Sequence, residues 1–509
     1  MRNYTGIVDN KQDDILSKLI GYVFIVLAGL ILFAKCIYMF DIFPVPLSII
    51  GILFTVAILI LLFKYFDILI YKIKNLIDIL NNCSYIKLLL LVITISLVTK
   101  IACIFIFDIV SIYDNSDINV YTTTSYELSH YGQAITHADY CARATHLFWY
   151  AVFLTPSSSL FGMSQIAFSV YISIISTISI ALLFDTVSFV FSKKKAFVFS
   201  IIYVLIPSQV ILTQFITHEH AIMLFLSIAI WLYFRVMPVV RNIYLKIILF
   251  LIIIANVVFC RLVNPGGRIV VIAFIIIFII SALRNIKKRT IFKCVFSCLA
   301  LIIALTVLSS CANNFQLSHS KISGNPEKGS ILWTFYIGSN YETSGSYSFE
   351  DADIWFEQQP KDKQIADKYH KDLLFNRYSD LIKNPIKLLD LCKNKLKNMW
   401  ANFNYSTGSA TEKINNKQTR DFYTSYLYKP SLLINYLIML LVGVICLYSS
   451  IVNRKKRKPL FYCFVQLYLL GFSAMLMLSE LQQRYTITML PLYLIAAIAV
   501  LDFKKQDNN

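Results

Sequence analysis

The chain has 509 residues, of which 57% are hydrophobic, and its mean hydropathy is +0.65. One globular core cannot bury that much apolar material, so the composition excludes an ordinary soluble protein. The formal net charge of +18 could indicate a nucleic-acid partner, but basic residues cluster beside apolar runs, as in Lys193-Lys194-Lys195. Such clusters are typical of topology anchors and of contacts with anionic lipid, so we expect membrane lipids and no nucleic acid as partners.

Apolar runs of bilayer-spanning length recur along the whole chain. We expect transmembrane helices at residues 19–40, 46–65, 86–107, 165–191, 196–214, 217–235, 243–260, 267–284, 291–311, 431–452, 459–479 and 485–503. The predicted fold class is therefore an all-α polytopic membrane protein with about 12 transmembrane helices.

The loops between these runs alternate between strongly basic and acidic or polar sequences. Basic loops stay in the cytoplasm, which places both termini on the cytoplasmic side of the plasma membrane. The first large outer loop, residues 108–146, then contains five acidic residues and a single arginine, Arg143. We expect an extracytoplasmic active site, because the polar clusters all fall on that side.

Four regions follow from this pattern. Residues 1–85 form an N-terminal cytoplasmic segment and an added transmembrane hairpin, and residues 86–311 form the transmembrane core with the loop 108–146. Residues 312–430, the polar block, are expected to be an extracytoplasmic and mainly helical domain, because leucines recur at helical spacing between 361 and 400. Residues 431–509 are the C-terminal helices and a cytoplasmic tail. The apolar segment 146–162 is interrupted by Pro156, so we expect it to lie at the outer interface.

Asp114 and Asp117 follow directly from the third predicted span. If the segment is helical, their i, i+3 spacing puts them on one face near the membrane surface. A carboxylate there could accept the proton of an attacking hydroxyl group, so both are candidate catalytic residues. An alternative interpretation is that Asp114 only caps a helix.

Thr217-His218-Glu219-His220 lies at the outer end of the sixth predicted span. The spacing differs from the i, i+4 histidines of a zinc helix, so we predict no metal site there. A divalent metal is compatible with the expected chemistry, but no residue pattern supports one. Glu219 is expected to line a polar cavity, because an acid at the edge of a span usually faces protein or water.

Arginines occur in two further outer turns, where positive charge is least expected. Arg261 and Arg268 flank one turn, and Glu480 and Arg484 lie in the turn before the last helix. Arginine grips phosphate through two parallel hydrogen bonds. The alternatives are interfacial snorkelling for the first pair and a mutual i, i+4 ion pair for the second.

Ordered pieces of the chain between about residues 105 and 503 resemble the polytopic GT-C glycosyltransferases, in particular bacterial family 39 and the protein-mannosyltransferase-like membrane enzymes. The pieces are Ser116-Asp117 with Tyr121, Ala142-Arg143-Ala144-Thr145-His146-Leu147, Pro207-Ser208 with Glu219, Asn264-Pro265-Gly266-Gly267, Gly338-Ser339-Asn340 with Gly345, Asn384-Pro385 with Lys395 and Trp400, and Glu480 with Arg484-Tyr485. Similar proteins often carry Arg-Pro where this chain has Asn264-Pro265.

The resemblance implies a GT-C-type fold and an inverting transfer of a sugar from a polyprenyl-phosphate donor. It implies that an aspartate of the first outer loop, best matched by Asp117, is the base. The acceptor is a glycan, lipid or protein that the sequence does not identify. The substrate-binding residues expected on this basis are Tyr121, Arg143, His146, Glu219, Arg261, Arg268, Glu480, Arg484 and Tyr485.

Two other classes of function remain open. A lipid-linked glycan flippase or other transporter would also be polytopic, although transporters usually show repeats and polar residues near the bilayer midplane. A surface-polysaccharide polymerase or ligase would also use polyprenyl carriers, but it would join whole repeat units.

Overall fold

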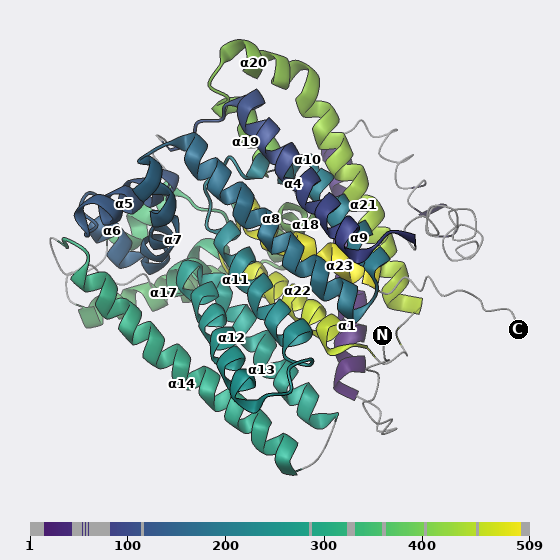
Figure 1. Cartoon of the computed structure of the whole chain (residues 1–509). Coiled ribbons are helices and arrows are strands. Elements are labelled where there is room, and N and C mark those ends of the chain that lie inside the picture. The colour runs from purple at the N-terminus through teal and green to yellow at the C-terminus, as the bar shows by residue number, and fades with distance from the viewer. Residues whose placement is uncertain are drawn as a thin grey trace, which may run out of the picture.

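The protein is described by a computed structural model in which most of the described residues are helical (Figure 1). The structure describes residues 15–42, 82–112, 117–284, 288–322, 331–358, 363–401, 405–452, 454 and 458–499, together with isolated positions between 53 and 60. Within these ranges, nine helices are long and apolar enough to cross a membrane. The chain is therefore an all-helical, multi-pass membrane protein by length and composition.

These spans correspond to nine of the expected runs. They are formed by α1 (Ile15–Ile42), α4 (Tyr85–Phe107), α8 (Gln165–Val190), α11 (Glu219–Trp231) with the π-helical turn η1 (Leu232–Val236), α12 (Ile243–Val263), α13 (Arg268–Leu283), α14 (Lys288–Ser318), α21 (Tyr428–Val452) and α22 (Leu460–Leu478). Side-chain caps begin several of them: Ser84 accepts a hydrogen bond at the start of α4, and Ser164 does so for α8.

Two of the expected spans are wrong as continuous helices. The run 196–214 is divided into α9 (Lys193–Leu205) and α10 (Pro207–Leu212), because Pro207 forces Ile206 into an extended conformation. The run 485–503 begins as a 3-10 segment, η5 (Gln483–Thr488), and continues as α23 (Leu490–Ala499). The expected helix 46–65 lies outside the continuously described residues.

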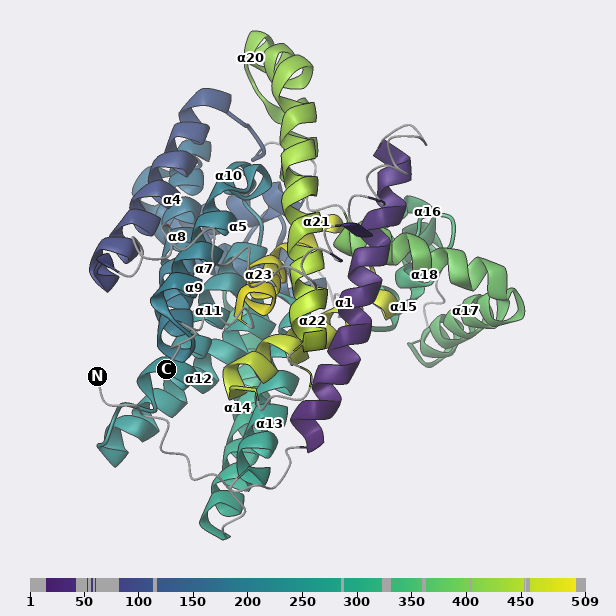
Figure 2. The same cartoon turned by 90° about the vertical axis from the view of Figure 1, so that its right-hand side faces the viewer.

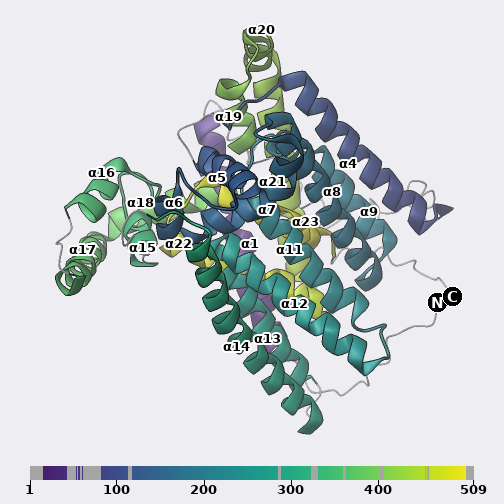
Figure 3. The same cartoon turned by 60° about the vertical axis from the view of Figure 1, so that its left-hand side comes forward.

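The apolar segment near residue 150 is the helix α7 (Thr145–Phe161), which is not among the nine candidate spans. It packs against α5 (Asp117–Tyr131), and the short helix α6 (Ala138–Arg143) joins the two. These three helices lie together at one end of the bundle (Figures 1 and 3). They follow α4 in the chain, and α7 packs against the spans α8, α12 and α14.

The polar block is helical, as its leucine spacing predicts. Its elements are the end of α14, then α15 (Ile331–Gly338), α16 (Phe349–Ala352) with η3 (Asp353–Glu357), α17 (Lys363–Lys383), α18 (Pro385–Trp400), α19 (Tyr405–Lys413) and α20 (Lys417–Phe422) with η4 (Tyr423–Leu427). Helices α15 to α18 project from one side of the bundle (Figures 2 and 3).

Helix α18 attaches this projection to the membrane bundle. Lys397 forms an ion pair of 2.7 Å with Asp41 of α1, and Lys35 donates a 2.6 Å hydrogen bond to the carbonyl oxygen of Trp400. Lys395 reaches the end of α22, as described below. The block is therefore tied to α1 and to α22, the first and the last of the nine candidate spans in the described residues.

The bundle interior also contains a buried lysine. Lys100 of α4 is fully buried, and its amino group donates to the hydroxyl oxygens of Ser96 at 3.0 Å and Ser176 at 2.8 Å. Hydroxyl groups satisfy its hydrogen bonds but do not neutralise its charge.

Candidate active site

An ion pair between Asp117 and Arg484 lies at the centre of the candidate site. One guanidinium nitrogen of Arg484 lies 2.9 Å from a carboxylate oxygen of Asp117, although the two residues are 367 positions apart. Asp117 is the first residue of α5, where the positive end of the helix dipole favours a carboxylate. Arg484 lies in η5, directly after the turn that follows α22. Tyr140 donates to the other carboxylate oxygen of Asp117 at 3.2 Å.

A second carboxylate lies near the same guanidinium group. The Nε atom of Arg484 is 4.0 Å from Glu219, the first residue of α11. Glu219 is completely buried, whereas the Asp117 side chain is 26% exposed. Arg484 therefore lies between one acid in the protein interior and one acid that solvent can reach.

His218 links Glu219 to Tyr121. Its Nε2 atom is 3.4 Å from Glu219, and its Nδ1 atom is 3.1 Å from the hydroxyl oxygen of Tyr121. If Nε2 carries the proton, Nδ1 accepts from the Tyr121 hydroxyl group, which is the tautomer that satisfies both contacts. The rings of His146 and Tyr150 pack against His218 at centroid distances of 5.6 and 6.2 Å. The histidine is thus held by aromatic neighbours.

The charges of the site follow from burial and from Arg484. Burial favours the protonated form of Asp117, but the charge and hydrogen bond of Arg484, with smaller contributions from His146 and His218, hold the pKa of that carboxyl group below its ordinary value. Burial lowers the pKa of His146 to about 4, and burial together with Arg484 lowers the pKa of His218 well below its ordinary value. Near neutral pH, the site has an ionised aspartate, a charged arginine and neutral histidines.

Glu480 and Tyr485 complete the cluster. Glu480 accepts a 2.6 Å hydrogen bond from the side-chain amide of Gln482, and burial raises the pKa of its carboxyl group. The ring of Tyr485 lies 6.4 Å from that of His218 and 5.7 Å from the Arg484 guanidinium carbon. The ion-pair partners of Arg484 are Asp117 and Glu219, because the segment between Glu480 and Arg484 is not the α-helix that an i, i+4 pair needs.

Most of the residues singled out from the sequence meet at this place. Those in the cluster are Asp117, Tyr121, His146, Glu219, Glu480, Arg484 and Tyr485. Arg143 is instead exposed on α6. Arg261 donates to the hydroxyl group of Ser309 at 2.9 Å, and Arg268 begins α13. Asp114 lies outside the described residues.

Three residues of the cluster were not expected as site residues: His218, Tyr140 and Gln482. His218 was considered only for a metal, although its position beside Glu219 at the start of a span was a usable signal. Nothing in the sequence around Tyr140 or Gln482 distinguishes them from other loop residues. Over the described ranges, no group of three or more His, Cys, Asp or Glu residues is arranged to hold a metal ion.

Comparisons with known proteins leave the family open. No protein-family model matches the chain, and no curated protein matches it. Two solved structures with some likeness are ArnT from Cupriavidus metallidurans bound to undecaprenyl phosphate and the same protein in the apo state. Each is 11% identical, the alignments cover 80% and 81% of this chain and 77% of ArnT, and the TM-scores are 0.30 and 0.31. TM-scores this low do not establish a shared fold.

Proposed function

We propose that the protein is a membrane glycosyltransferase with a GT-C-type fold. It transfers a sugar from a polyprenyl-phosphate donor to a glycan, lipid or protein acceptor, with inversion at the anomeric carbon. The observation that carries the proposal is the shared guanidinium group of Arg484, placed between a solvent-accessible aspartate and a buried glutamate at one end of a membrane bundle. Such a site offers a base and an anion-binding cation side by side, within reach of a lipid carrier.

In the proposed reaction Asp117 acts as the general base. The hydroxyl oxygen of the acceptor attacks the anomeric carbon while its proton moves to the Asp117 carboxylate. The bond between that carbon and the phosphate oxygen breaks, and the polyprenyl phosphate leaves with the electron pair. Asp117 is ionised at neutral pH and partly exposed, and each of its carboxylate oxygens keeps a further lone pair beside its present hydrogen bond.

Arg484 stabilises the departing phosphate, on which negative charge develops. Its guanidinium group has five N–H donors in one plane, and only one contact is a short hydrogen bond to a carboxylate. The remaining donors suit phosphate oxygens. Tyr121, His146, Glu219, Glu480 and Tyr485 line the same place and are proposed to bind the sugar and the phosphate, while Arg143, Arg261 and Arg268 remain proposed contacts at its margin.

The site is proposed to face the outside of the cell, and cysteine labelling tests this. Tyr131, at the exposed end of α5, is replaced by Cys, and Val239, in the connection between η1 and α12, serves as the matched control on the opposite side. In intact cells, a membrane-impermeant maleimide is expected to label Tyr131→Cys above the wild-type background and to leave Val239→Cys unlabelled. Labelling of Tyr131→Cys only after cell lysis would place the site in the cytoplasm.

The activity is tested with a radiolabelled polyprenyl-phosphate sugar in membranes with and without the protein. Asp117→Asn removes the base but keeps the shape of the side chain, so transfer is expected to fall by about 10²–10⁴-fold. Asp372→Asn, an exposed acid on α17, is the matched control and should retain wild-type transfer. Full activity of Asp117→Asn would remove Asp117 from the mechanism, and Asp114→Asn would then be the variant to measure.

A further inference from the structure

We propose that Asp351 and Arg377 of the polar block are positioning residues for the candidate active site. Their ion pair fixes the loop 338–346, this loop holds the turn 479–482, and the turn presents Arg484 to Asp117. The inference rests on the proposed function, because it assigns these residues a role in that reaction. No hydrogen bond or ion pair joins the residues of the ion pair or the loop to Asp117 in the described structure, and the turn is the connection through which we expect them to act.

The turn 479–482 is held mainly by hydrogen bonds from the polar block. The backbone N–H of Glu480 donates to the carbonyl oxygen of Thr334 at 2.7 Å, and the N–H of Leu481 donates to that of Gly345 at 2.8 Å. The hydroxyl group of Ser346 donates to the carbonyl oxygen of Leu481 at 3.0 Å. The turn is thus bound through the backbone of Glu480 and Leu481, four and three residues before Arg484.

Two side chains of the block bind the end of α22, immediately before the turn. The amino group of Lys395 donates to the carbonyl oxygens of Met477 at 3.0 Å and Ser479 at 2.7 Å. Tyr378 of α17 donates to the carbonyl oxygen of Leu478 at 3.2 Å. These carbonyl groups have no partner within the helix, and a cation there also complements the negative end of the helix dipole. The end of α22 is therefore fixed to the block.

Two glycines allow the close approach of the loop and the turn. A Cβ atom at Gly338 would overlap the backbone of Leu478 and Ser479. Gly345 has φ +78°, and a Cβ atom there would overlap the side chain of Lys395. The backbone of the loop consequently lies directly on the backbone of the turn, and a small shift of one displaces the other.

The loop itself is organised by Asn340. Its side-chain oxygen accepts hydrogen bonds from the N–H groups of Glu342 at 2.9 Å and Thr343 at 3.3 Å, and its backbone carbonyl accepts from Gly345 at 2.8 Å. The side-chain amide of Asn340 donates to Asp351 at 2.7 Å. The conformation of the loop therefore depends on where Asp351 holds Asn340.

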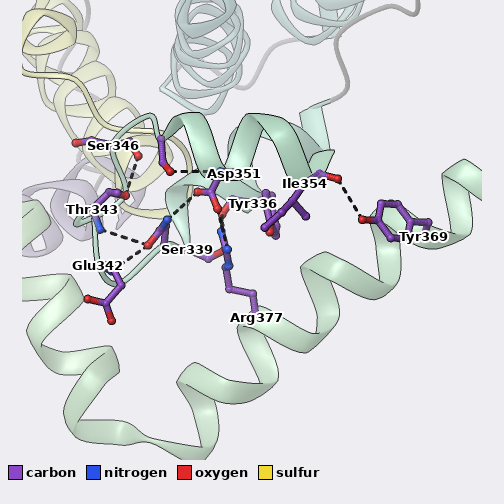
Figure 4. A network of polar contacts seen from close by, with 11 residues as sticks. Tyr336, Ser339, Glu342, Thr343, Ser346, Asp351, Ile354, Tyr369 and Arg377 are labelled. Carbon is purple, nitrogen blue, oxygen red and sulfur yellow. Dashed lines mark hydrogen bonds and ion pairs between the residues drawn. The ribbon is translucent and has the colours of Figure 1, made fainter. Parts of the chain in front are cut away.

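Arg377 fixes Asp351 in turn, as Figure 4 shows. A guanidinium nitrogen of Arg377 lies 2.8 Å from Asp351, whose side chain is only 2% exposed. A second nitrogen donates to the carbonyl oxygen of Tyr336 at 3.2 Å, and the guanidinium group covers the Tyr336 ring at 3.8 Å from its centroid. Removing Arg377 would leave a buried carboxylate without a counter-charge, so the carboxylate would have to move toward solvent or take up a proton.

The decisive measurements combine hydrogen exchange with kinetics. In Arg377→Met the amides of Glu480 and Leu481 are expected to exchange faster than in the wild type, because their acceptors are no longer held. The kcat of transfer is expected to fall by about tenfold, and KM for the donor is expected to change by less than about twofold. The reason is that the misplaced guanidinium group of Arg484 acts in the transition state. The acid limb of the pH–rate profile should move to higher pH, because a retreating Arg484 no longer keeps Asp117 ionised. Added guanidinium ion should restore part of the rate.

Matched variants keep the inference testable if Arg377→Met does not fold. Ser346→Ala removes one hydrogen bond to the turn and should show the same three changes in weaker form. Lys371→Met removes an exposed cation of α17 in the same block and should behave as the wild type. If the turn amides of Arg377→Met and Ser346→Ala exchanged at the wild-type rate, the inference would be overturned. Faster exchange in these variants with an unchanged kcat and pH profile would also overturn it. A wild-type protein without transferase activity would instead refute the proposed function, because the exchange data do not depend on catalysis.

Discussion

Replacement of Arg484 is the most direct test of how the site is built. Arg484→Met keeps much of the length of the side chain but leaves Asp117 and Glu219 without their shared cation. At an effective dielectric constant of about 20, a charge pair about 4 Å apart is worth about 4 kcal/mol. The Asp117 side chain is 26% exposed, so solvent reduces the net loss of unfolding free energy to about 2–3 kcal/mol.

The effect on the reaction should be larger than the effect on stability. Loss of one preorganised donor to a developing oxyanion typically lowers kcat by about 10²–10³-fold. Without Arg484, burial becomes the dominant influence on Asp117 and raises its pKa, so the acid limb of the rate profile should move to higher pH. Arg484→Lys keeps the charge but loses the planar donor group, and we expect it to recover stability more fully than rate.

The assay is transfer from a radiolabelled polyprenyl-phosphate sugar by purified protein in detergent, with the folded fraction of each variant measured by denaturant unfolding. Rates are expressed per folded molecule, so that a loss of stability does not count as a loss of catalysis. If Arg484→Met retained more than about a third of the wild-type rate per folded molecule, phosphate stabilisation by Arg484 would be refuted.

Three further outcomes are expected. Glu219→Gln should lower transfer by about tenfold while changing the unfolding free energy by less than about 1 kcal/mol, since the contacts of Glu219 with His218 and Arg484 are both longer than an ordinary hydrogen bond; unchanged transfer would remove Glu219 from the site. Unfolding free energy should fall as the pH drops from 6.5 to about 4, because the unfolded chain binds protons at His146 in that window and the folded chain does not; His146→Gln should reduce this slope, and an unaltered slope would contradict the assignment. Lys100→Met should leave transfer unchanged and keep or raise the melting temperature, because it replaces a buried charge that has only hydroxyl partners. A marked loss of stability or transfer would show that the amino group of Lys100 is needed for folding or for the reaction.

Much of the fold could be predicted because the bilayer imposes a length and a composition on each span. The spans that were wrong contain local features that hydropathy averages away. Pro207 divides one expected span, and the segment after Gln482 begins with a 3-10 turn. The proline effect was available from the sequence, since the residue before a proline is disfavoured in a helix. The 3-10 turn had no comparable signal.

Several residues of the candidate site could be singled out from the sequence, but the ion pairs between them could not. Acids and arginines at predicted span ends had to lie near one membrane surface, which is why Asp117, Glu219 and Arg484 were all singled out. The sequence offered Glu480 as one possible partner of Arg484, because a spacing of four residues is compatible with a helical pair. The actual partner, Asp117, is 367 positions away, and only the packing of α5 against the end of the bundle brings it there.

The unequal burial of the two acids determines how the site should respond to a donor phosphate. Glu219 is completely buried, so its charge would be costly to leave without Arg484. Asp117 is partly exposed, and water can replace part of what Arg484 provides. A phosphate that competes for the guanidinium group would therefore weaken the contact with Asp117 and not the contact with Glu219. As the contact between Arg484 and Asp117 weakens, Asp117 becomes a stronger proton acceptor. This happens when the sugar carried by the phosphate is in place. In the proposed reaction, Arg484 would therefore couple donor binding to the strength of the base.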